Sequence, residues 1–443
     1  MLTGQRLAPF FCEDSILSQI TTYHSDGILS RGGIRDEPFN CVGLIGMTVK
    51  KQTIGILTSG GDCPGLNAVI RGTVKCAEAL GYGVVGIQRG YEGLVDPVST
   101  VELTSQNTSG ILVQGGTILG STNQGRFCAI KGENTRVDLD RGLLESVRRT
   151  TEALNLKGLV CVGGDGSLAV AQQFHEIGIP VVGVPKTIDN DLSSTVFTFG
   201  FDSAVACATD ALDRLHTTAA SHERIMVLEV MGRHTGWIAL HSGIAGGADV
   251  ILLPEIDWTF EHVCAKVLAR RAAGKNFTII IVAEGAKLPA GKTVTRERRQ
   301  EDRQTRLGGI GSVVSTELAL RLGLEARNCV LGHLQRGGGP TAFDRFLSTQ
   351  FGVQAVRLLH ENRFGRMVCY QPPEINDVSI AEAIGQLKRV DIHCSAIQTG
   401  RGLGISFGDR SATEDVIDTT CIGTSYAPLN VDHSPIIVNA NAF

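Results

Sequence analysis

The sequence predicts an α/β fold built mainly from parallel, buried strands. Several short apolar runs have the length and composition of strands that are covered on both faces. Most of these runs lead into glycine-rich or polar turns, and segments with helical periodicity follow the turns. Polar side chains also recur just after the strands, at the edge where open α/β sheets bind their ligands.

The composition argues against several classes of protein. The chain has 443 residues, enough for two or three domains, with 42% hydrophobic and 19% charged residues. A net charge of −4 gives no electrostatic reason to expect binding to nucleic acid or to an anionic membrane. The 12 cysteines include no Cys-x-x-Cys pair, which argues against a zinc site and favours reduced thiols in the cytoplasm. No apolar run reaches the length of a membrane helix.

Regular structure is expected to begin after residue 50. Residues 1–50 lack sustained periodicity and the charged start of a secretory signal, so we expect a loosely ordered extension, with a transit peptide as the alternative. A strand at 53–58 then leads into the turn Ser59–Asn67 and a helix that ends at about Leu80. The glycines of this turn would let the backbone approach a phosphate near the helix amides, although an ordinary βα turn is the bland interpretation. No Lys-Ser/Thr pair follows, so the turn is not a Walker A loop.

A second glycine-rich segment, 114–121, precedes Asn123, Arg126 and Phe127. The arginine is a candidate to face a phosphate, and the phenylalanine a candidate surface for a base to rest on.

The third unit is a strand at 158–163, the turn Gly163-Gly-Asp-Gly-Ser167 and a helix. This turn also fits a loose dinucleotide fingerprint with Asp189 downstream, so a nicotinamide-dependent oxidoreductase is a rival hypothesis. Two details weigh against it. Asp165, between glycines, suits a Mg²⁺ ion that bridges phosphates better than it suits a pyrophosphate cradle. Asp189 also lies five residues beyond Val184, where the next strand is expected to end, whereas a ribose-binding acid should end its strand directly.

The stretch Pro185-Lys-Thr-Ile-Asp-Asn-Asp191 follows that next apolar run directly. Two carboxylates with a hydroxyl and an ammonium are costly to gather unless charge is handled there. One carboxylate could take a proton from a substrate hydroxyl, and the other could orient that hydroxyl or a metal-bound water. An Asx-rich turn is the competing interpretation, and the neighbouring segments favour catalysis.

Polar residues also end the later strands. The strand at 225–230 leads to Arg233, placed for a phosphoryl group, and a strand at 277–283 ends at Glu284. We expect residues 327–336 to form a strand with arginine at one end and histidine and arginine at the other. A surface ion pair or a structural histidine would explain each feature singly. Their repetition at strand ends indicates one shared cleft.

Together these segments make the chain resemble the phosphofructokinase family. The motifs that carry the resemblance, in the family's order between about residues 53 and 390, are Gly60–Asn67, Gly163–Ser167, Pro185–Asp191, Met231–Arg233, Glu284 and Gly332–Arg336. The resemblance implies two Rossmann-like three-layer α/β domains, with mostly parallel sheets, that face a common cleft. The implied parts are residues 51–200 plus about 335–385 for ATP and Mg²⁺, and residues 201–334 plus about 386–395 for the sugar phosphate, with residues 396–443 as a tail.

The resemblance also implies phosphoryl transfer from ATP, with Mg²⁺, to the 1-hydroxyl of fructose 6-phosphate. Asp189 would be the catalytic base, Asp191 would support it, and Asp165 would hold the metal. The other residues implied in catalysis are Thr187, Arg233, Gly166 and Lys186. The donor-site residues would be Gly61, Arg126, Phe127, Asp165, Gly166 and Ser167. The sugar-site residues would be Thr187, Asp189, Asp191, Met231, Gly232, Arg233, Glu284, His333 and Arg336, with Arg224 and Arg327 reaching a neighbouring subunit's site in a homodimer or homotetramer.

The phosphoryl donor depends on two positions. Diphosphate-using members of the family carry Asp at the position of Gly166 and Lys at that of Lys186, whereas the bacterial ATP enzymes carry Gly at both. This chain combines Gly166 with Lys186. An aspartate there would crowd and repel an α-phosphate, but a lysine blocks nothing, so we expect ATP, with diphosphate as the alternative. Arg126 also comes later than the family's donor-side arginine, and Asn123 is the alternative for that role.

Overall fold

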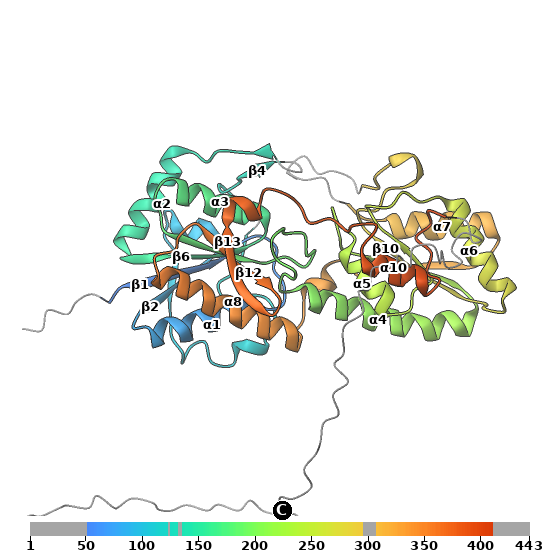
Figure 1. The fold of residues 1–443 in the computed structure, drawn as a ribbon, viewed down its shortest axis with the longest axis horizontal. Coiled ribbons are helices and arrows are strands. Elements are labelled where there is room, and N and C mark those ends of the chain that lie inside the picture. The colour runs from blue at the N-terminus through green and yellow to red at the C-terminus, as the bar shows by residue number, and fades with distance from the viewer. Residues whose placement is uncertain (1–50, 123–124, 132–134, 296–306, 411–443) are drawn as a thin grey trace, which may run out of the picture. The chain divides into compact units, whose positions relative to one another are not determined.

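The strands form two main sheets, and both are mostly parallel (Figure 1). A computed structural model of the chain describes residues 51–122, 125–131, 135–295 and 307–410. The α/β class predicted from the sequence is confirmed. Among these residues, no helix is both long enough and apolar enough to span a bilayer.

The first sheet has seven strands in the order β13-β12-β7-β6-β1-β2-β3. They are β1 (Thr53–Thr58), β2 (Gly83–Ile87), β3 (Thr100–Leu103), β6 (Leu156–Gly163), β7 (Val181–Pro185), β12 (Arg366–Gln371) and β13 (Glu374–Ser379). The strands from β12 to β2 run parallel, and β3 and β13 pair antiparallel at the edges. The central strands are almost wholly buried, because helices cover both faces of the sheet.

The second sheet has four parallel strands in the order β11-β8-β10-β9. They are β8 (Ile225–Val230), β9 (Val250–Leu252), β10 (Thr278–Ala283) and β11 (Ala326–Val330). Strands β8, β9 and β10 are buried throughout, but the edge strand β11 is largely exposed. A separate antiparallel ribbon pairs β4 (Ile130–Lys131) with β5 (Thr135–Arg136).

The helices divide between the two sheets. With the first sheet lie α1 (Leu66–Ala79), α2 (Arg141–Ala153), α3 (Asp165–Glu176), α8 (Ala342–His360) and α9 (Ile380–Ala383). With the second lie α4 (Phe201–His222), α5 (Trp237–Ala245), α6 (Phe260–Ala272), α7 (Ile310–Leu322) and α10 (Ser395–Gly402). The short 3₁₀ turns are η1 (Gly90–Leu94), η2 (Ile111–Val113), η3 (Pro289–Gly291) and η4 (Gly332–Arg336).

One hydrophobic core joins the two sheets. Buried side chains of α1 and α8, such as Ile70 and Phe351, belong to the same cluster as those of α4 and α5, such as Leu212 and Leu240. A second cluster packs α2 and α3 on the other face of the first sheet. A third packs α6 and α7 on the second sheet. Because the first cluster is continuous, both sheets belong to one folded unit.

Two segments differ from the sequence prediction. Residues 327–336 are not one strand, because β11 ends at Val330 and Gly332, with φ 48°, begins η4 instead. Glycine adopts this left-handed conformation without steric cost. The tail does not begin at about 396 either. Helix α10 starts at Ser395, and the backbone of Ser406 bonds to Ile251 at 2.9 Å and to Asp249 at 3.1 Å, beside β9. The expected extension 1–50 and the rest of the tail, 411–443, lie outside the described residues.

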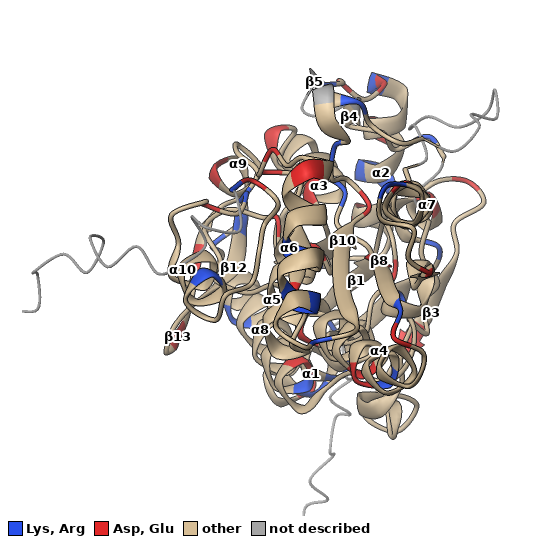
Figure 2. Ribbon diagram, turned by 90° about the vertical axis from the view of Figure 1, so that its right-hand side faces the viewer, with Lys and Arg blue, Asp and Glu red and all other residues tan. Residues whose placement is uncertain are grey.

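Charged residues of both signs are interspersed over the described chain. Figure 2 shows Lys and Arg as well as Asp and Glu on many of the helices and loops.

Candidate active site

The candidate residues follow the carboxyl ends of parallel strands in both sheets. Asp165 opens α3 just after β6, and the stretch to Asp191 follows β7. In the second sheet, Met231 follows β8 and Glu284 follows β10. Strand edges of this kind are where open α/β sheets bind ligands.

The first glycine turn is held by cations from two other segments. The Lys186 ammonium donates a hydrogen bond to the Gly61 carbonyl oxygen. The Arg336 guanidinium, from η4, lies 3.5 Å from the Asp62 carbonyl oxygen. A Cβ atom at Gly61 would stand 1.8 Å from Arg336 Nη1, so only glycine allows this approach. Residues from both sheets therefore meet at this turn.

The N-terminus of α3 presents an open backbone surface. Gly164 caps the helix, and Asp165 lies in its first turn. A Cβ atom at Gly166 would meet no heavy atom within 4 Å, so the space in front of this residue is open. The Tyr91 hydroxyl donates to the Ser167 carbonyl oxygen at 2.7 Å and fixes the turn from behind. Free amides at such a helix end form a favourable site for phosphate oxygens.

Asp189 is a carboxylate without full compensation. Its Oδ1 is buried and has no hydrogen-bond partner among the described residues. Burial raises the pKa of Asp189, and the charge of Asp165 raises it further, while Arg336, His234 and Lys186 oppose the shift. These charges come from both sheets, so the residues predicted from separate motifs converge on one group.

Asp191 lies on the same loop and shares this field. Burial, Asp189 and Asp165 raise its pKa to about 7, and a hydrogen bond from Thr187 opposes the shift. The Thr187 hydroxyl oxygen also accepts from the Asp189 backbone N–H at 3.1 Å. The intervening Asn190 has a left-handed backbone (φ 51°), and its side-chain oxygen accepts from the Thr198 N–H at 3.0 Å. This conformation fixes the loop between the two carboxylates.

The second sheet supplies a further carboxyl group, Glu284, which interacts with Asp189. Burial and the charges of Asp189 and Glu229 raise the pKa of Glu284 to about 7, whereas Arg233 and Arg336 oppose the shift. Glu284 therefore lies within electrostatic range of Asp189, Arg233 and Arg336.

Two hydrogen bonds hold the backbone near Glu284 and the end of β8. The Met231 N–H donates to Gln335 Oε1 at 2.7 Å, and the Gly285 N–H donates to the Gly232 carbonyl oxygen at 3.0 Å. His333 lies exposed on η4, two residues before Gln335.

Three further residues support the site and were not predicted. The Thr235 hydroxyl donates to the Asp189 carbonyl oxygen at 3.1 Å, linking the two sheets. Gln335 orients Met231, and the Lys388 N–H donates to the Asp191 carbonyl oxygen at 2.8 Å. Thr235 and Gln335 belong to motifs that the sequence does show, so their neighbours could have drawn attention to them. Lys388 lies in a linker with no pattern of its own.

Arg126 and Phe127, the candidate ATP-site residues after Gly120, contact a neighbouring turn and the core. Arg126 forms an ion pair with Glu92 at 2.8 Å, and Phe127 packs against Tyr91 and Phe174. The structure thus joins both residues to a neighbouring turn and core, and their donor-site role stays a prediction. Asn123, the alternative, lies outside the described residues.

Arg224 and Arg327 lie at the amino-terminal ends of β8 and β11, whereas the candidate site lies at the carboxyl ends of the strands. Both pair with Glu325, at 2.8 Å and 2.7 Å, where β8 and β11 begin. Strand β8 has six residues, which correspond to roughly 20 Å between its two ends. The structure therefore does not bring these two arginines to the Asp189 group of the same chain.

Comparison with known proteins identifies relatives over the same region. Residues 53–359 match the family described as phosphofructokinase. A protein of Chloroflexus aggregans named ATP-dependent 6-phosphofructokinase is 51% identical over 82% of this chain and 99% of its own length. A Streptomyces coelicolor protein named pyrophosphate–fructose 6-phosphate 1-phosphotransferase is 47% identical over 76% of this chain and 96% of its own. The crystal structure of Pichia pastoris phosphofructokinase in the T-state is similar with a TM-score of 0.66 and 30% identity, over 83% of this chain and 38% of that longer one.

Proposed function

The chain belongs to the phosphofructokinase family, and we propose that it transfers a phosphoryl group from ATP to the 1-hydroxyl of fructose 6-phosphate. The products are fructose 1,6-bisphosphate and ADP, as in glycolysis. The observation that carries the proposal is Asp189, whose buried, unpartnered oxygen lies within the field of cations from both sheets. A family of sugar-phosphate kinases leaves no role for the nicotinamide-dependent alternative, which we do not retain.

Asp189 would act as the general base. Its raised pKa makes the carboxylate a better proton acceptor, and its free Oδ1 can take the proton of the attacking hydroxyl. Thr187 connects the Asp189 backbone to the Asp191 side chain and would help to fix both groups. Arg233 would stabilise the charge of the moving phosphoryl group, because a guanidinium pairs well with phosphate oxygens.

The sugar phosphate would lie against the second sheet. Met231, Gly232 and Glu284 line the strand ends there, and Glu284 would accept hydrogen bonds from sugar hydroxyls once it is ionised. Arg336 and His333 would approach the phosphate from η4. The backbone bonds around Met231 and Gly232 hold this surface in place.

Mg²⁺ fits the acidic side of the site. Asp165 and Asp189 both raise the pKa of Asp191, so uncompensated negative charge gathers here. Among the described residues, no group of three or more His, Cys, Asp or Glu is placed to hold a metal by itself. Mg²⁺ often takes one or two carboxylates and completes its coordination with phosphates and water. Asp165 would hold the ion, which would neutralise phosphate charge during transfer.

ATP is favoured over diphosphate by the open space at Gly166. No atom lies where a side chain at this residue would begin, so a nucleotide's α-phosphate has room beside the helix amides. Lys186 is held by the Gly61 carbonyl and adds charge without filling that space. Diphosphate remains the second candidate because one relative at 47% identity carries a pyrophosphate-dependent name.

A donor assay tests this proposal. Purified full-length chain is given fructose 6-phosphate with ATP, ADP or diphosphate in separate reactions, and fructose 1,6-bisphosphate is measured. We expect product with ATP. Gly166→Asp should lower kcat/KM for ATP by about a hundredfold, since a second charge then occupies the donor path. Equal use of ATP by that variant, or product with diphosphate only, would contradict the donor assignment.

We also propose self-association with a shared site. Arg224 and Arg327 lie where β8 and β11 begin, away from the Asp189 group of their own chain, and this position supports a role at another chain's site. Mixing inactive Asp189→Asn with Arg327→Ala subunits tests this directly. Each mixed pair would contain one intact site, so activity should exceed that of either variant alone. No recovery after subunit exchange would contradict the shared site.

A cytoplasmic location belongs to the same proposal. The cysteines of the described residues are free thiols, which suits a reducing compartment.

A further inference from the structure

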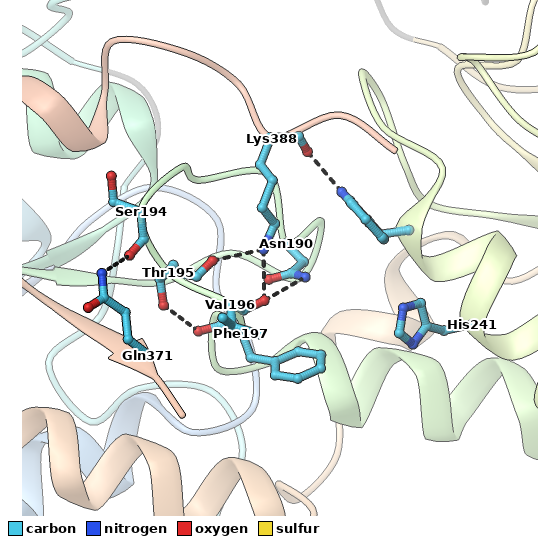
Figure 3. A pocket seen from close by; sticks show the side chains of 9 residues that line it. Asn190, Ser194, Thr195, Val196, Phe197, His241, Gln371 and Lys388 are labelled. Atoms are coloured by element: carbon cyan, nitrogen blue, oxygen red, sulfur yellow. Dashed lines mark hydrogen bonds between the residues drawn. The ribbon is translucent and has the colours of Figure 1, made fainter. Parts of the chain in front are cut away.

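A pocket lies beside the loop that carries Asp189 and Asp191, and none of the residues proposed to contact the substrates or Mg²⁺ lines it (Figure 3). Its volume is 490 Å³, and its walls come from the loop 190–197, α5, the end of β12 and the linker at Lys388. Small-molecule sites commonly have volumes of about 300–1,000 Å³. Its size therefore suits one small ligand.

Three aromatic rings form one side of this pocket. Phe197, Trp237 and His241 all line it, and none of them is fully buried. The His241 ring meets Trp237 at 6.0 Å and Phe197 at 6.5 Å, edge to face. Partly exposed rings in this arrangement present flat apolar area to an incoming molecule. The wall therefore favours a planar ligand.

Lys388 provides a hydrogen-bond donor, and its partner on the ligand need not be an anion. Its ammonium donates to the carbonyl oxygens of Thr195 at 2.9 Å and Val196 at 2.8 Å. An ammonium has three donors, and no other oxygen or nitrogen atom of the described residues accepts the third, although Nζ also lies over the Trp237 ring, 5.7 Å from its centroid. The charge of Asp191 already acts on Lys388 and opposes the effect of burial on its pKa. A neutral acceptor on the ligand therefore suits the remaining N–H better than a second carboxylate.

His241 adds a second uncommitted polar group. No described residue hydrogen-bonds to its ring nitrogens, and burial together with Lys388 lowers its pKa. The ring is therefore neutral at physiological pH, with one nitrogen donating and one accepting. It can meet a heteroaromatic edge that carries complementary atoms.

We propose that this pocket binds a planar, neutral heteroaromatic molecule of one or two rings that carries a hydrogen-bond acceptor. The ring would rest on Trp237 and Phe197, and the acceptor would take the free N–H of Lys388. This inference goes beyond the phosphoryl-transfer function and does not depend on it. A ligand here would also contact the reactive loop, because Lys388 bonds to Asp191 through its backbone N–H and to the Trp237 indole through its carbonyl, both at 2.8 Å.

Intrinsic fluorescence provides the test. The chain has two tryptophans, so Trp258→Phe leaves Trp237 as the only reporter, at the pocket wall. The substitution should be tolerated because the Trp258 indole N–H is buried without a partner. Nicotinamide is the test ligand. Nicotinate keeps the ring but adds a charge, and cyclohexanecarboxamide keeps the amide but is not planar.

We expect a saturable change in Trp237 fluorescence with nicotinamide and affinities at least about tenfold weaker for the other two compounds. Val196→Phe, at the pocket mouth, should weaken nicotinamide binding by about tenfold or more. Val98→Phe is the matched control, since Val98 is 48% exposed and Val196 is 45% exposed. Its affinity should equal that of the parent.

Ligand-observed saturation-transfer NMR on the unsubstituted chain repeats the measurement independently of fluorescence. Excess ADP is included, so that binding at the proposed donor site cannot produce the signal. Absence of saturable nicotinamide binding by both methods, equal binding by the Val196→Phe variant, or tighter binding of nicotinate would each overturn the proposal. Because the readout is binding rather than turnover, a chain that failed as a kinase would leave this result unaffected.

Discussion

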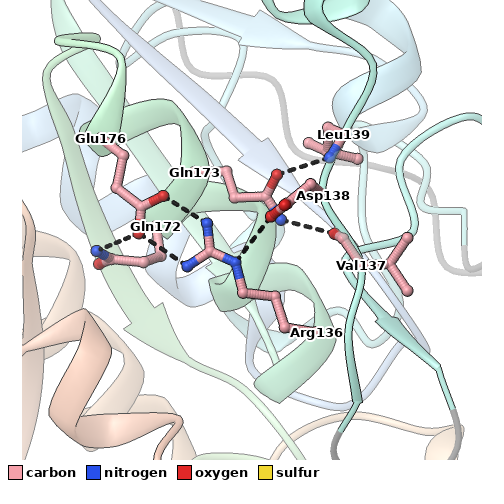
Figure 4. Close-up of polar contacts among 7 residues, drawn as sticks. All are labelled: Arg136, Val137, Asp138, Leu139, Gln172, Gln173 and Glu176. Carbon is pink, nitrogen blue, oxygen red and sulfur yellow. Dashed lines mark hydrogen bonds and ion pairs between the residues drawn. The ribbon is translucent and has the colours of Figure 1, made fainter.

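The two ends of α3 lie near two charged clusters that differ in how their charges are compensated. In the candidate active site, Asp189 has a buried oxygen with no partner among the described residues, and burial raises its pKa. Near the other end of α3, Arg136 pairs with Asp138 at 3.0 Å and with Glu176 at 2.6 Å, and the Arg136 hydrogen bond lowers the pKa of Glu176 (Figure 4). Paired, exposed charge thus supports the scaffold, whereas uncompensated buried charge marks the candidate active site.

The paired cluster has a positioning task. Gln173, on α3, accepts from the Leu139 N–H and donates to the Val137 carbonyl oxygen, both at 2.8 Å. Together with Arg136 it holds the chain before α2 against α3 (Figure 4). The first turn of α3 carries Asp165, so this cluster helps to hold a helix of the candidate active site without belonging to that site.

The largest effect should follow neutralisation of the unpaired acid. Asp189→Asn keeps the side-chain shape but removes the proton acceptor, so kcat should fall by roughly 10² to 10⁴. Steady-state rates of ADP formation measure this change, and binding of fructose 6-phosphate should stay within a few-fold. Asp138→Asn, in the exposed cluster, is the matched control and should retain kcat. A variant at 189 with near-normal turnover would break the comparison.

The next effect concerns pH at the sugar side. The pKa of Glu284 is raised to about 7, so its carboxyl is protonated below that pH and ionised above it. If the ionised form accepts sugar hydroxyls, KM for fructose 6-phosphate should rise several-fold as the pH falls from about 8 to about 6. In the Glu284→Gln variant KM should already be high and should change little over this range. An unaltered pH profile in the variant would remove Glu284 from sugar binding.

A smaller loss is expected at the bond that joins the two sheets. Thr235→Val removes the hydroxyl that holds the Asp189 carbonyl at 3.1 Å, while the shape at this buried position is preserved. A hydrogen bond of this kind contributes about 1 kcal/mol, so kcat should fall roughly fivefold with KM nearly unchanged. Thr235→Ser keeps the hydroxyl and should restore kcat. Similar losses in both variants would indicate a packing effect instead.

The smallest effect should come from the exposed cluster itself. Arg136 is 56% exposed and Asp138 is 83% exposed, so solvent screens their attraction. Arg136→Gln should lower the free energy of unfolding by about 0.5 kcal/mol or less and leave kcat intact. Urea unfolding at low and high salt measures this difference, which should shrink as salt is added. A several-fold loss in kcat would show instead that the Arg136 cluster affects the candidate active site.

The sequence predicted the strand ends better than the contacts between them. The runs before Gly163, Pro185 and Met231 have strong apolar character, so their strands and turns were predictable, and the structure places the following polar residues as expected. The bond from Thr235 to Asp189 joins residues 46 positions apart, and no local pattern reports such a pair. The tail prediction failed because Ser406 pairs with β9 through contacts that are distant in the sequence.

Stability measurements on two variants test the central claim most directly. At neutral pH the raised pKa of Asp189 means that its ionised form costs folding free energy, so Asp189→Asn should raise the free energy of unfolding. The lowered pKa of Glu176 has the opposite consequence for stability. Its ionised form stabilises the fold above the unfolded-state pKa, and this stabilisation is lost as the pH falls. Glu176→Gln should therefore lower the free energy of unfolding slightly. Urea unfolding of both variants beside the parent should give changes of opposite sign. Destabilisation by both would contradict the distinction between compensated and uncompensated charge.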